Sequence, residues 1–299
     1  MNLRIENKTI LMTGATGFLG SNLLKELLKK NLNVLVLKRS FSNTDRINSQ
    51  INKIETIDLD KSNIDDVFND HKIDTILHCA TDYGRKNNDR LSIIDANLML
   101  PLKLLELGVK HGVKQFINTD TLLDKRINYY SLSKKQFNDW LRTYANNILC
   151  VNVALEHFYG PFDDRTKFIS YLIGKVLANA PSIDLTPGKQ KRDFIFIDDV
   201  VAAFVKIIES FDLMDKEYHH YEIGTNEQIE IMGLALLIKE LAANKTTKLN
   251  FGALPYRENE QMEIKVDTNA IRKLGWEPEF SLKEGLKKTI DAERKAMKT

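Results

Sequence analysis

The stretch Thr13-Gly14-Ala15-Thr16-Gly17-Phe18-Leu19-Gly20 decides the fold, because it joins an apolar run at 10–12 to an amphipathic segment at 21–30. A strand that turns through glycines into a helix directs free backbone N–H groups and the positive helix end at one point, which suits a pyrophosphate. The spacing is G-x-x-G-x-x-G, whereas the commoner fingerprint is G-x-G-x-x-G. The stretch therefore predicts a dinucleotide-binding turn of a variant type, with a tight turn that holds no ligand as the alternative.

Apolar runs and amphipathic segments alternate through the first half of the chain, and this pattern builds a parallel sheet with crossover helices. Strands are expected at 9–13, 33–37, 54–57, 75–79, 115–118 and 148–153. Helices are expected at 19–30, 64–69, 91–111 and 133–146, with Pro101 kinking or dividing the third. The predicted fold class is α/β: a doubly wound parallel sheet (Rossmann) with a smaller α/β C-terminal substrate lobe.

The composition of the 299 residues is that of an ordinary globular protein, with 43% hydrophobic residues. Lysine and arginine number 43 against 41 acidic residues, a net charge of +2, so no nucleic-acid partner is expected. Residues 1–12 lack the pattern of a secretory signal, and no segment is long enough to span a bilayer. We expect a cytoplasmic protein with no membrane partner. Cys79 and Cys150 lie in apolar runs and are expected to be reduced core thiols, with no metal site.

The segment Tyr130-Ser131-Leu132-Ser133-Lys134 places a tyrosine and a lysine four residues apart at the start of an expected helix. Side chains at i and i+4 share a helix face, so the ammonium of Lys134 can lie beside the phenol of Tyr130. A nearby cation lowers the pKa of a phenol and lets it exchange a proton with an alcohol oxygen. Such a spacing also arises by chance on solvated helices, but here it follows the fifth strand of a glycine-turn sheet.

The end of the second strand bears on the choice of cofactor. An acid at this position binds both ribose hydroxyls and repels a 2′-phosphate. This chain has Lys38, Arg39 and Ser40 there instead, and these groups suit a phosphate dianion. The sequence therefore predicts NADPH/NADP, with an ordinary exposed turn as the alternative. Residues 1–155 are expected to form the NADP-binding Rossmann domain, to which 193–227 return, and 156–299 the substrate-binding lobe.

At this point the chain resembles the extended short-chain dehydrogenase/reductases, in their nucleotide-sugar branch of epimerases, dehydratases and reductases. The matching segments are the glycine turn, Asp58-Leu59-Asp60, His78-Cys79-Ala80-Thr81, Tyr130 with Lys134, Tyr159-Gly160-Pro161, and Arg192-Asp193-Phe194 leading to Asp198-Asp199-Val200. The resemblance implies that the cofactor contacts Gly14, Thr16, Gly17, Phe18, Leu19, Gly20, Lys38, Arg39, Ser40, Asp58, Leu59, Ala80, Thr81 and Lys134. It also implies a homodimer built from the helices at 91–111 and 133–146.

Within the family, the likeness extends to reductases of CDP-linked 4-keto-3,6-dideoxy sugars, which supply O-antigen polysaccharide. It rests on residues 78–84, 118–121, 155–161, 192–200 and 251–260. Dehydratases of this fold follow their active-site Thr with an Asp-Glu pair, whereas Thr121 is followed by Leu122 and Leu123, which disfavours dehydration. An alternative register takes Thr119 as the active-site hydroxyl, and it still lacks the glutamate.

The resemblance thus implies an NADPH-dependent reduction at C4 of a nucleotide-linked 4-keto sugar. Tyr130 would protonate the developing alkoxide, Lys134 would lower its pKa and hold the ribose, and Thr121 would hydrogen-bond the ketone oxygen. The residues expected to bind the substrate are Tyr83, His157, Lys167, Arg192 and Arg257. A C4 epimerase with bound NAD and a non-catalytic NADP-sensing protein are the two alternatives.

Overall fold

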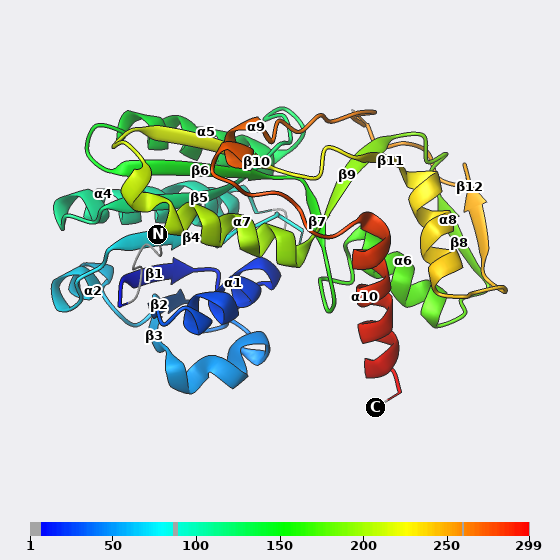
Figure 1. Ribbon diagram of the computed structural model, residues 1–299, viewed down its shortest axis with the longest axis horizontal. Coiled ribbons are helices and arrows are strands. Elements are labelled where there is room, and N and C mark those ends of the chain that lie inside the picture. The colour runs from blue at the N-terminus through cyan, green and yellow to red at the C-terminus, as the bar shows by residue number, and fades with distance from the viewer. Residues whose placement is uncertain (1–6, 86–88, 259, 299) are drawn as a thin grey trace. The chain divides into compact units, whose positions relative to one another are not determined.

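The computed structural model describes residues 7–85, 89–258 and 260–298 and divides the chain into two compact units (Figure 1). The first unit holds the described residues up to Leu155 together with Val201–Glu222 and Ala270–Trp276; the second holds the remainder. The segment that returns to the first unit is therefore shorter than the expected 193–227. The reason is that β9 (Lys191–Phe196) pairs with β7 (His157–Tyr159) and β11 (Gln228–Glu230) inside the second unit.

The first unit is built on a seven-stranded sheet. Its strands are β1 (Thr9–Thr13), β2 (Asn33–Lys38), β3 (Glu55–Asp58), β4 (Thr75–His78), β5 (Gln115–Thr121), β6 (Leu149–Leu155) and β10 (Tyr218–Ile223). They lie in the order β10-β6-β5-β4-β1-β2-β3, and β1 to β6 pair in parallel. The strand order reverses between β1 and β4, which is where doubly wound sheets bind ligands. The predicted fold class is confirmed, whereas strand β10 was not predicted.

Helices cover both faces of this sheet (Figure 1). On one face, α2 (Ile64–Asp70), α4 (Leu100–Lys110) and α5 (Tyr129–Thr143) share a core with alternate strand residues such as Leu11 and Phe116, both fully buried. The intervening residues Ile10 and Met12 point to the other face, where α1 (Phe18–Lys29) and the later part of α7 (Ile197–Glu209) lie. The 3-10 segments η1 (Asp45–Lys53) and η3 (Phe211–Leu213) connect these elements. Among the helices of the described residues, none is long and apolar enough to cross a bilayer.

The long helix expected at 91–111 is divided, as Pro101 predicted. It consists of α3 (Arg90–Ile94), the π-helical turn η2 (Asp95–Met99) and α4, with Pro101 in the first turn of α4. A proline is tolerated there because the first N–H groups of a helix lack intrahelical partners. A π-helical turn is uncommon and often marks a functional position, which draws attention to the residues it presents.

The second unit combines two small sheets with helices. It contains α6 (Phe168–Leu177), β8 (Ser182–Leu185), α8 (Ile231–Leu241), β12 (Lys248–Phe251) and α10 (Leu282–Ala296), whereas the short α9 (Asn269–Lys273) lies almost wholly in the first unit. The sheets have the orders β11-β9-β7 and β12-β8. The buried carboxylate of Asp193 accepts hydrogen bonds from the backbone N–H groups of Thr225 and Asn226 and thereby fixes the turn before β11.

Candidate functional site

The glycine turn packs closely against the residues that follow β4. Gly14 has φ +71°, and a Cβ placed on it would lie 2.5 Å from the backbone nitrogen of Ala80. Thr13 Oγ1 accepts a hydrogen bond of 3.2 Å from that same nitrogen. The first turn of α1 follows, with Gly17 at its N-cap. Position 14 admits only glycine, because of its positive φ and because a Cβ would clash with the chain after β4. This glycine cradle, formed by Gly14 and the first turn of α1, lets a ligand approach the backbone beside a helix N-terminus. The predicted residues from Gly14 to Gly20 and Ala80 are therefore brought together.

The basic turn after β2 is paired with acids from the end of β3. Arg39 Nε lies 2.5 Å from Asp60 Oδ1, and Lys38 Nζ lies 4.0 Å from Asp58 Oδ2. Ser40 Oγ donates to Asp58 Oδ2 at 2.7 Å, and this bond is the main reason that the pKa of Asp58 is lowered. The cations expected to bind a 2′-phosphate thus already face carboxylates. Leu59 lies between the two acids and packs against the core of the first unit.

Helix α5 begins where it can display Tyr130 and Lys134 on one face. Asn128 and Ser131 form a reciprocal capping box, with Asn128 Oδ1 accepting from the Ser131 N–H at 2.8 Å. This cap sets the helix start at Tyr129, four residues before the expected Ser133. Asn, Ser and Tyr are weak helix formers, which hid the first turn from the helical pattern. The i, i+4 geometry that the motif requires is therefore present.

Lys134 is a buried cation of the first unit. Its side chain is 1% exposed, and its Nζ has no hydrogen-bond partner among the described residues. Burial lowers its pKa to about 8, and the carboxylate of Asp120 opposes this effect. A buried ammonium without partners is costly unless a ligand satisfies it. Together with the glycine cradle, this orphaned donor fits the ribose hydroxyls of a nicotinamide dinucleotide.

The surroundings of Tyr130 correct one expectation. The pKa of Tyr130 is raised well above its ordinary value by burial first and then by Tyr83 and Asp120. A hydrogen bond with Thr121 and the charge of Arg85 only partly oppose this rise. From the sequence, Lys134 is expected to lower this pKa, but burial dominates, and Arg85 is the cation that acts on the phenol. Tyr130 is consequently held in its neutral, proton-donating form.

Two further side chains define what surrounds Tyr130. The ring of Tyr83 lies 4.9 Å from the ring of Tyr130, and the Arg85 guanidinium lies 4.8 Å above Tyr83. Thr121, rather than Thr119, bonds to Tyr130, since Thr119 Oγ1 donates to the backbone oxygen of His78 at 3.1 Å. The geometry therefore favours the register in which Thr121 is the active-site hydroxyl.

Asn97, which the sequence analysis did not select, ties this region together. It is fully buried in the π-helical turn, and its Oδ1 accepts from the Asp82 N–H at 2.8 Å. Its Nδ2 donates to Asp82 O at 2.8 Å and to Ser133 Oγ at 3.0 Å. A single asparagine thus joins the chain before Tyr83 to the helix that carries Tyr130. An amide inside an otherwise apolar helix face, four residues before a proline, was the signal available in the sequence.

Of the residues expected to bind the substrate, His157, Lys167, Arg192 and Arg257 lie in the second unit. Arg192 is 7% exposed, and its Nη2 lies 2.5 Å from Glu260 Oε1. Lys167 Nζ lies 3.1 Å from Asp163 Oδ2, while Arg257 is exposed. The pKa of His157 is lowered by burial and by the cations Arg192 and Lys167. His157, Arg192 and Lys167 therefore lie close together. Among the described residues, no contact joins Arg257 to Arg192.

Both cysteines are free thiols, as expected from their apolar surroundings. Burial raises the pKa of Cys79 and of Cys150 to about 12. Neither is a thiolate near neutral pH, so neither carries nucleophilic chemistry. In the part of the chain that the structure describes, no group of three or more His, Cys, Asp or Glu side chains could hold a metal ion.

A doubly wound sheet, a glycine turn and a Tyr-Lys pair together define a class of dinucleotide-dependent enzymes. The model of the NAD dependent epimerase/dehydratase family matches residues 10–224, and the chain belongs to this family. CDP-abequose synthase from Salmonella muenchen is 36% identical over 95% of this chain and 97% of its own length. CDP-abequose synthase from Yersinia pseudotuberculosis is 27% identical over 85% of this chain and 90% of its own length.

Among solved structures, the fold is similar to that of UDP-glucose 4-epimerase from Thermotoga maritima. That structure has a TM-score of 0.83 and 24% identity, and the match covers 97% of this chain and 99% of the other. UDP-glucose 4-epimerase from Thermus thermophilus, solved with NAD, gives a TM-score of 0.81 at 22% identity over 96% of this chain and 99% of the other. At such identities the likeness establishes the fold.

Proposed function

We propose that this protein is an NADPH-dependent reductase of the C4 ketone of a nucleotide-linked 4-keto deoxy sugar, of the CDP-4-keto-3,6-dideoxyglucose type, for surface polysaccharide. The observation that carries the proposal is the buried Lys134 ammonium, without a hydrogen-bond partner among the described residues and one helical turn from Tyr130. The similarity to CDP-abequose synthase over almost the whole chain supports the substrate class.

In the proposed reaction, the bound cofactor supplies the hydride for C4. Tyr130 donates its phenolic proton to the C4 oxygen as negative charge develops there. The raised pKa of Tyr130 keeps this proton in place across the physiological range. Thr121 donates a second hydrogen bond to the same oxygen, and Lys134 holds the nicotinamide ribose. Arg192, with His157 and Lys167 close by, is assigned to the substrate's diphosphate and Tyr83 to its sugar.

The preference for NADPH is proposed from Lys38, Arg39 and Ser40. A 2′-phosphate can accept charge-assisted hydrogen bonds from these groups, but it must share them with Asp58 and Asp60. A net reductase also has to release its spent cofactor, which suits NADP. The preference for NADPH over NADH therefore depends on how well the 2′-phosphate competes with the carboxylates of Asp58 and Asp60 for the same donors.

A panel of CDP-, dTDP- and GDP-linked 4-keto sugars mixed with NADPH tests the function. We expect stoichiometric oxidation of NADPH with at least one CDP-linked ketone and a single C4 configuration in the product. No oxidation with any member of the panel, by folded protein that binds NADPH, would contradict the proposal.

A C4 epimerase with bound NAD is the second candidate. The ion pairs between the basic turn and Asp58 and Asp60 favour it, because acids near the adenine ribose are compatible with NAD. An epimerase would retain NAD through purification and interconvert C4 epimers without net cofactor oxidation. Analysis of the cofactor released on denaturation, together with the ketone panel, separates the two functions.

A homodimer is proposed from the helices that follow β4 and β5. On these helices, Leu105, Phe137 and Leu141 are fully buried within the first unit. Other large apolar side chains of α3, η2 and α5 are exposed: Leu91 at 70%, Met99 at 52% and Trp140 at 49%. These three elements contact one another, so the exposed apolar side chains belong to one group of helices, and we assign them to the dimer contact.

Light scattering at micromolar concentration should therefore give twice the chain mass of 34.3 kDa. The variant Leu91→Glu should shift the mass toward the monomer, because it places charge in an apolar contact, while the exposed Leu213→Glu serves as a control on another surface. A mass near 34.3 kDa for the unsubstituted protein would reject the dimer.

A further inference from the structure

Asp120 is a fully buried carboxylate at the end of β5, next to Thr121 in the chain. Its Oδ2 lies 3.0 Å from Lys135 Nζ and accepts a hydrogen bond of 2.9 Å from Asn152 Nδ2. Its Oδ1 accepts the backbone N–H of Thr121 at 2.7 Å. Three donors from β5, α5 and β6 thus satisfy one buried carboxylate.

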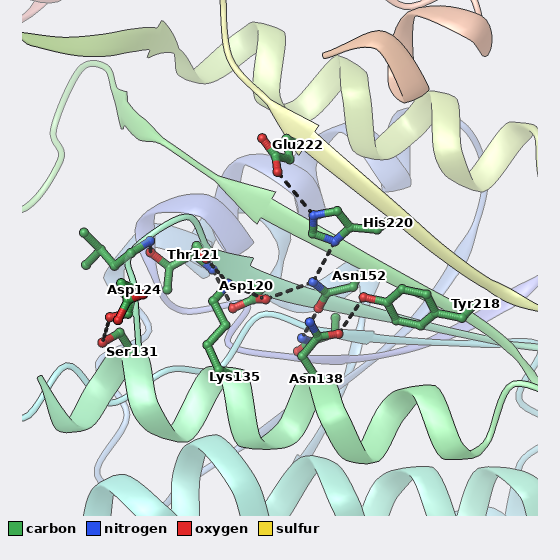
Figure 2. A network of polar contacts seen from close by, with 12 residues as sticks. Asp120, Thr121, Asp124, Ser131, Lys135, Asn138, Asn152, Tyr218, His220 and Glu222 are labelled. Atoms are coloured by element: carbon green, nitrogen blue, oxygen red, sulfur yellow. Dashed lines mark hydrogen bonds and ion pairs between the residues drawn. The ribbon is translucent and has the colours of Figure 1, made fainter. Parts of the chain in front are cut away.

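The contacts continue across the sheet to its edge, as Figure 2 shows. Asn152 Nδ2 also contacts His220 Nδ1 at 3.2 Å, and His220 Nε2 lies 3.5 Å from Glu222 Oε1. Asn152 Oδ1 accepts from Asn118 Nδ2 at 2.7 Å. Because the amide of Asn152 is bonded on both its oxygen and its nitrogen, its orientation toward Asp120 is fixed. Strand β10, absent from the sequence prediction, therefore supports a residue beside Tyr130.

The network holds both backbone polar groups of Thr121. Its backbone N–H donates to Asp120, and its backbone carbonyl accepts from Lys135 Nζ. Lys135 bridges Thr121 and Asp120 from the helix that carries Tyr130, so the strand end and the helix are joined through one ammonium (Figure 2). The hydroxyl of Thr121, which bonds to Tyr130, is positioned by these contacts.

The charge of Asp120 also acts on Lys134. Asp120 on β5 raises the pKa of Lys134, and so does Cys79 after β4, whereas Lys135 on α5 lowers it. His78 at the end of β4 also faces Lys134, and burial together with that ammonium lowers the pKa of His78. His78 and the thiol of Cys79 are neutral near pH 7, since the pKa of Cys79 is raised to about 12. Asp120 is thus the anion among these facing groups.

Around Tyr130, the facing groups are Tyr83, Arg85 and Asp120. Tyr83 and Asp120 both favour the neutral phenol, while Arg85 favours the phenolate. The same carboxylate therefore favours a charged Lys134 and a neutral Tyr130, which are the two forms that the proposed reaction uses.

We propose that Asp120 is a positioning residue for the proposed reduction: it fixes Thr121 through the backbone and acts as the anion facing the buried Lys134 ammonium, with Lys135 as the opposing cation. This assignment rests on the proposed function for the roles of Thr121 and Lys134. The charge relation between Asp120, Lys135 and Lys134 belongs to the protein alone and is tested without cofactor or substrate.

The test is an NMR titration of the protein labelled with ¹³C-lysine, in which the Lys134 signal is identified by its loss in Lys134→Met. The wild-type pKa of Lys134 is expected near 8. In Asp120→Asn we expect it to fall by roughly 1 unit, because an opposite charge is removed. In Lys135→Met we expect it to rise, because a like charge is removed. The matched control is Tyr218→Phe, which removes the 2.6 Å hydrogen bond to Asn138 in the same region and is expected to leave the pKa unchanged.

Opposite shifts in the two variants support the proposal, since general loosening of the structure would move both in the same direction. Shifts of the same sign, or none, overturn it. If Asp120→Asn does not fold, the double variant Asp120→Asn, Lys135→Met removes both ion-pair members, and its Lys134 pKa must lie below that of Lys135→Met alone. NADPH affinity of the same proteins against pH then tests the proposed function separately: affinity that ignores the Lys134 pKa contradicts the ribose role and leaves the titration result standing.

Discussion

Two groups of cations in the first unit are assigned to the proposed cofactor, and they differ in whether they are already paired with a protein group. Lys134 is buried and has no hydrogen-bond partner among the described residues, whereas Lys38 and Arg39 are paired with Asp58 and Asp60. A ligand that reaches Lys134 gains a donor that no protein group contests. A phosphate that reaches Arg39 has to displace or share a carboxylate. For the proposed function, the comparison teaches that the part common to NAD and NADP would meet a donor without a competing protein acceptor, while discrimination of the 2′-phosphate would depend on competing ion pairs.

The largest effect is expected on the buried side, at Tyr130. Tyr130→Phe keeps the ring that packs against Tyr83 and removes the proton donor, so turnover should fall by roughly 10²–10⁴-fold. NADPH affinity should be retained, because the hydroxyl is not assigned to the cofactor. Steady-state kinetics with an accepted ketone and a fluorescence titration of NADPH provide the two measurements. Unchanged turnover in this variant would show that Tyr130 is structural.

The next effect is expected on cofactor affinity at Lys134. Lys134→Met removes a charged donor to the ribose, and such a bond contributes on the order of 1.5–3 kcal/mol, so NADPH affinity should fall roughly tenfold to hundredfold. Calorimetric titration measures the loss. NADH affinity should fall by a similar factor, because the nicotinamide ribose is common to both cofactors. A loss confined to NADPH would place Lys134 at the 2′-phosphate instead.

The same substitution should stabilise the protein, because the buried ammonium is disfavoured in the folded state. The fall of its pKa from 10.5 to about 8 corresponds to about 3 kcal/mol at pH 7. The folded pKa lies below the unfolded one, so the wild-type free energy of unfolding should rise between pH 8 and 10.5 as the folded protein loses this proton first. The advantage of Lys134→Met should disappear over the same window, which urea unfolding at several pH values checks.

A smaller effect, on the choice between NADPH and NADH, is expected when the ion pair between Arg39 and Asp60 is changed. Asp60→Asn frees Arg39 Nε from an ion pair, so the ratio of NADPH to NADH affinity should rise a few-fold, up to roughly tenfold. Arg39→Asp should move the ratio in the opposite direction by a similar factor. Lys61→Met, which alters a neighbouring exposed pair with Asp58, is the control. If Asp60→Asn left the ratio unchanged, the carboxylate would not compete with the phosphate.

The strands and the Tyr-Lys pair could be predicted because their signals are local. Six of the seven strands of the large sheet follow from apolar runs, and the position of Lys134 relative to Tyr130 follows from the helical repeat. The first turn of α5 was missed because its capping box, formed by Asn128 and Ser131, uses residues with weak helix propensity. Strand β10 was missed because its segment carries two histidines and alternates weakly.

The sequence by itself therefore determined the doubly wound fold, the glycine cradle and the placement of Tyr130 beside Lys134 on one helix. The tertiary structure decided which charges meet. Arg192 pairs with Glu260, and Asn152 contacts His220; in both pairs the residues lie 68 positions apart in the sequence. Asn152 also bonds to Asp120 and so joins it to His220. Regular elements arise from spacing along the chain, which a sequence displays directly. Ion pairs and buried amide contacts depend on which strand ends and turns become neighbours after packing. The same packing buries Tyr130 and Lys134, and burial is the main cause of their shifted pKa values.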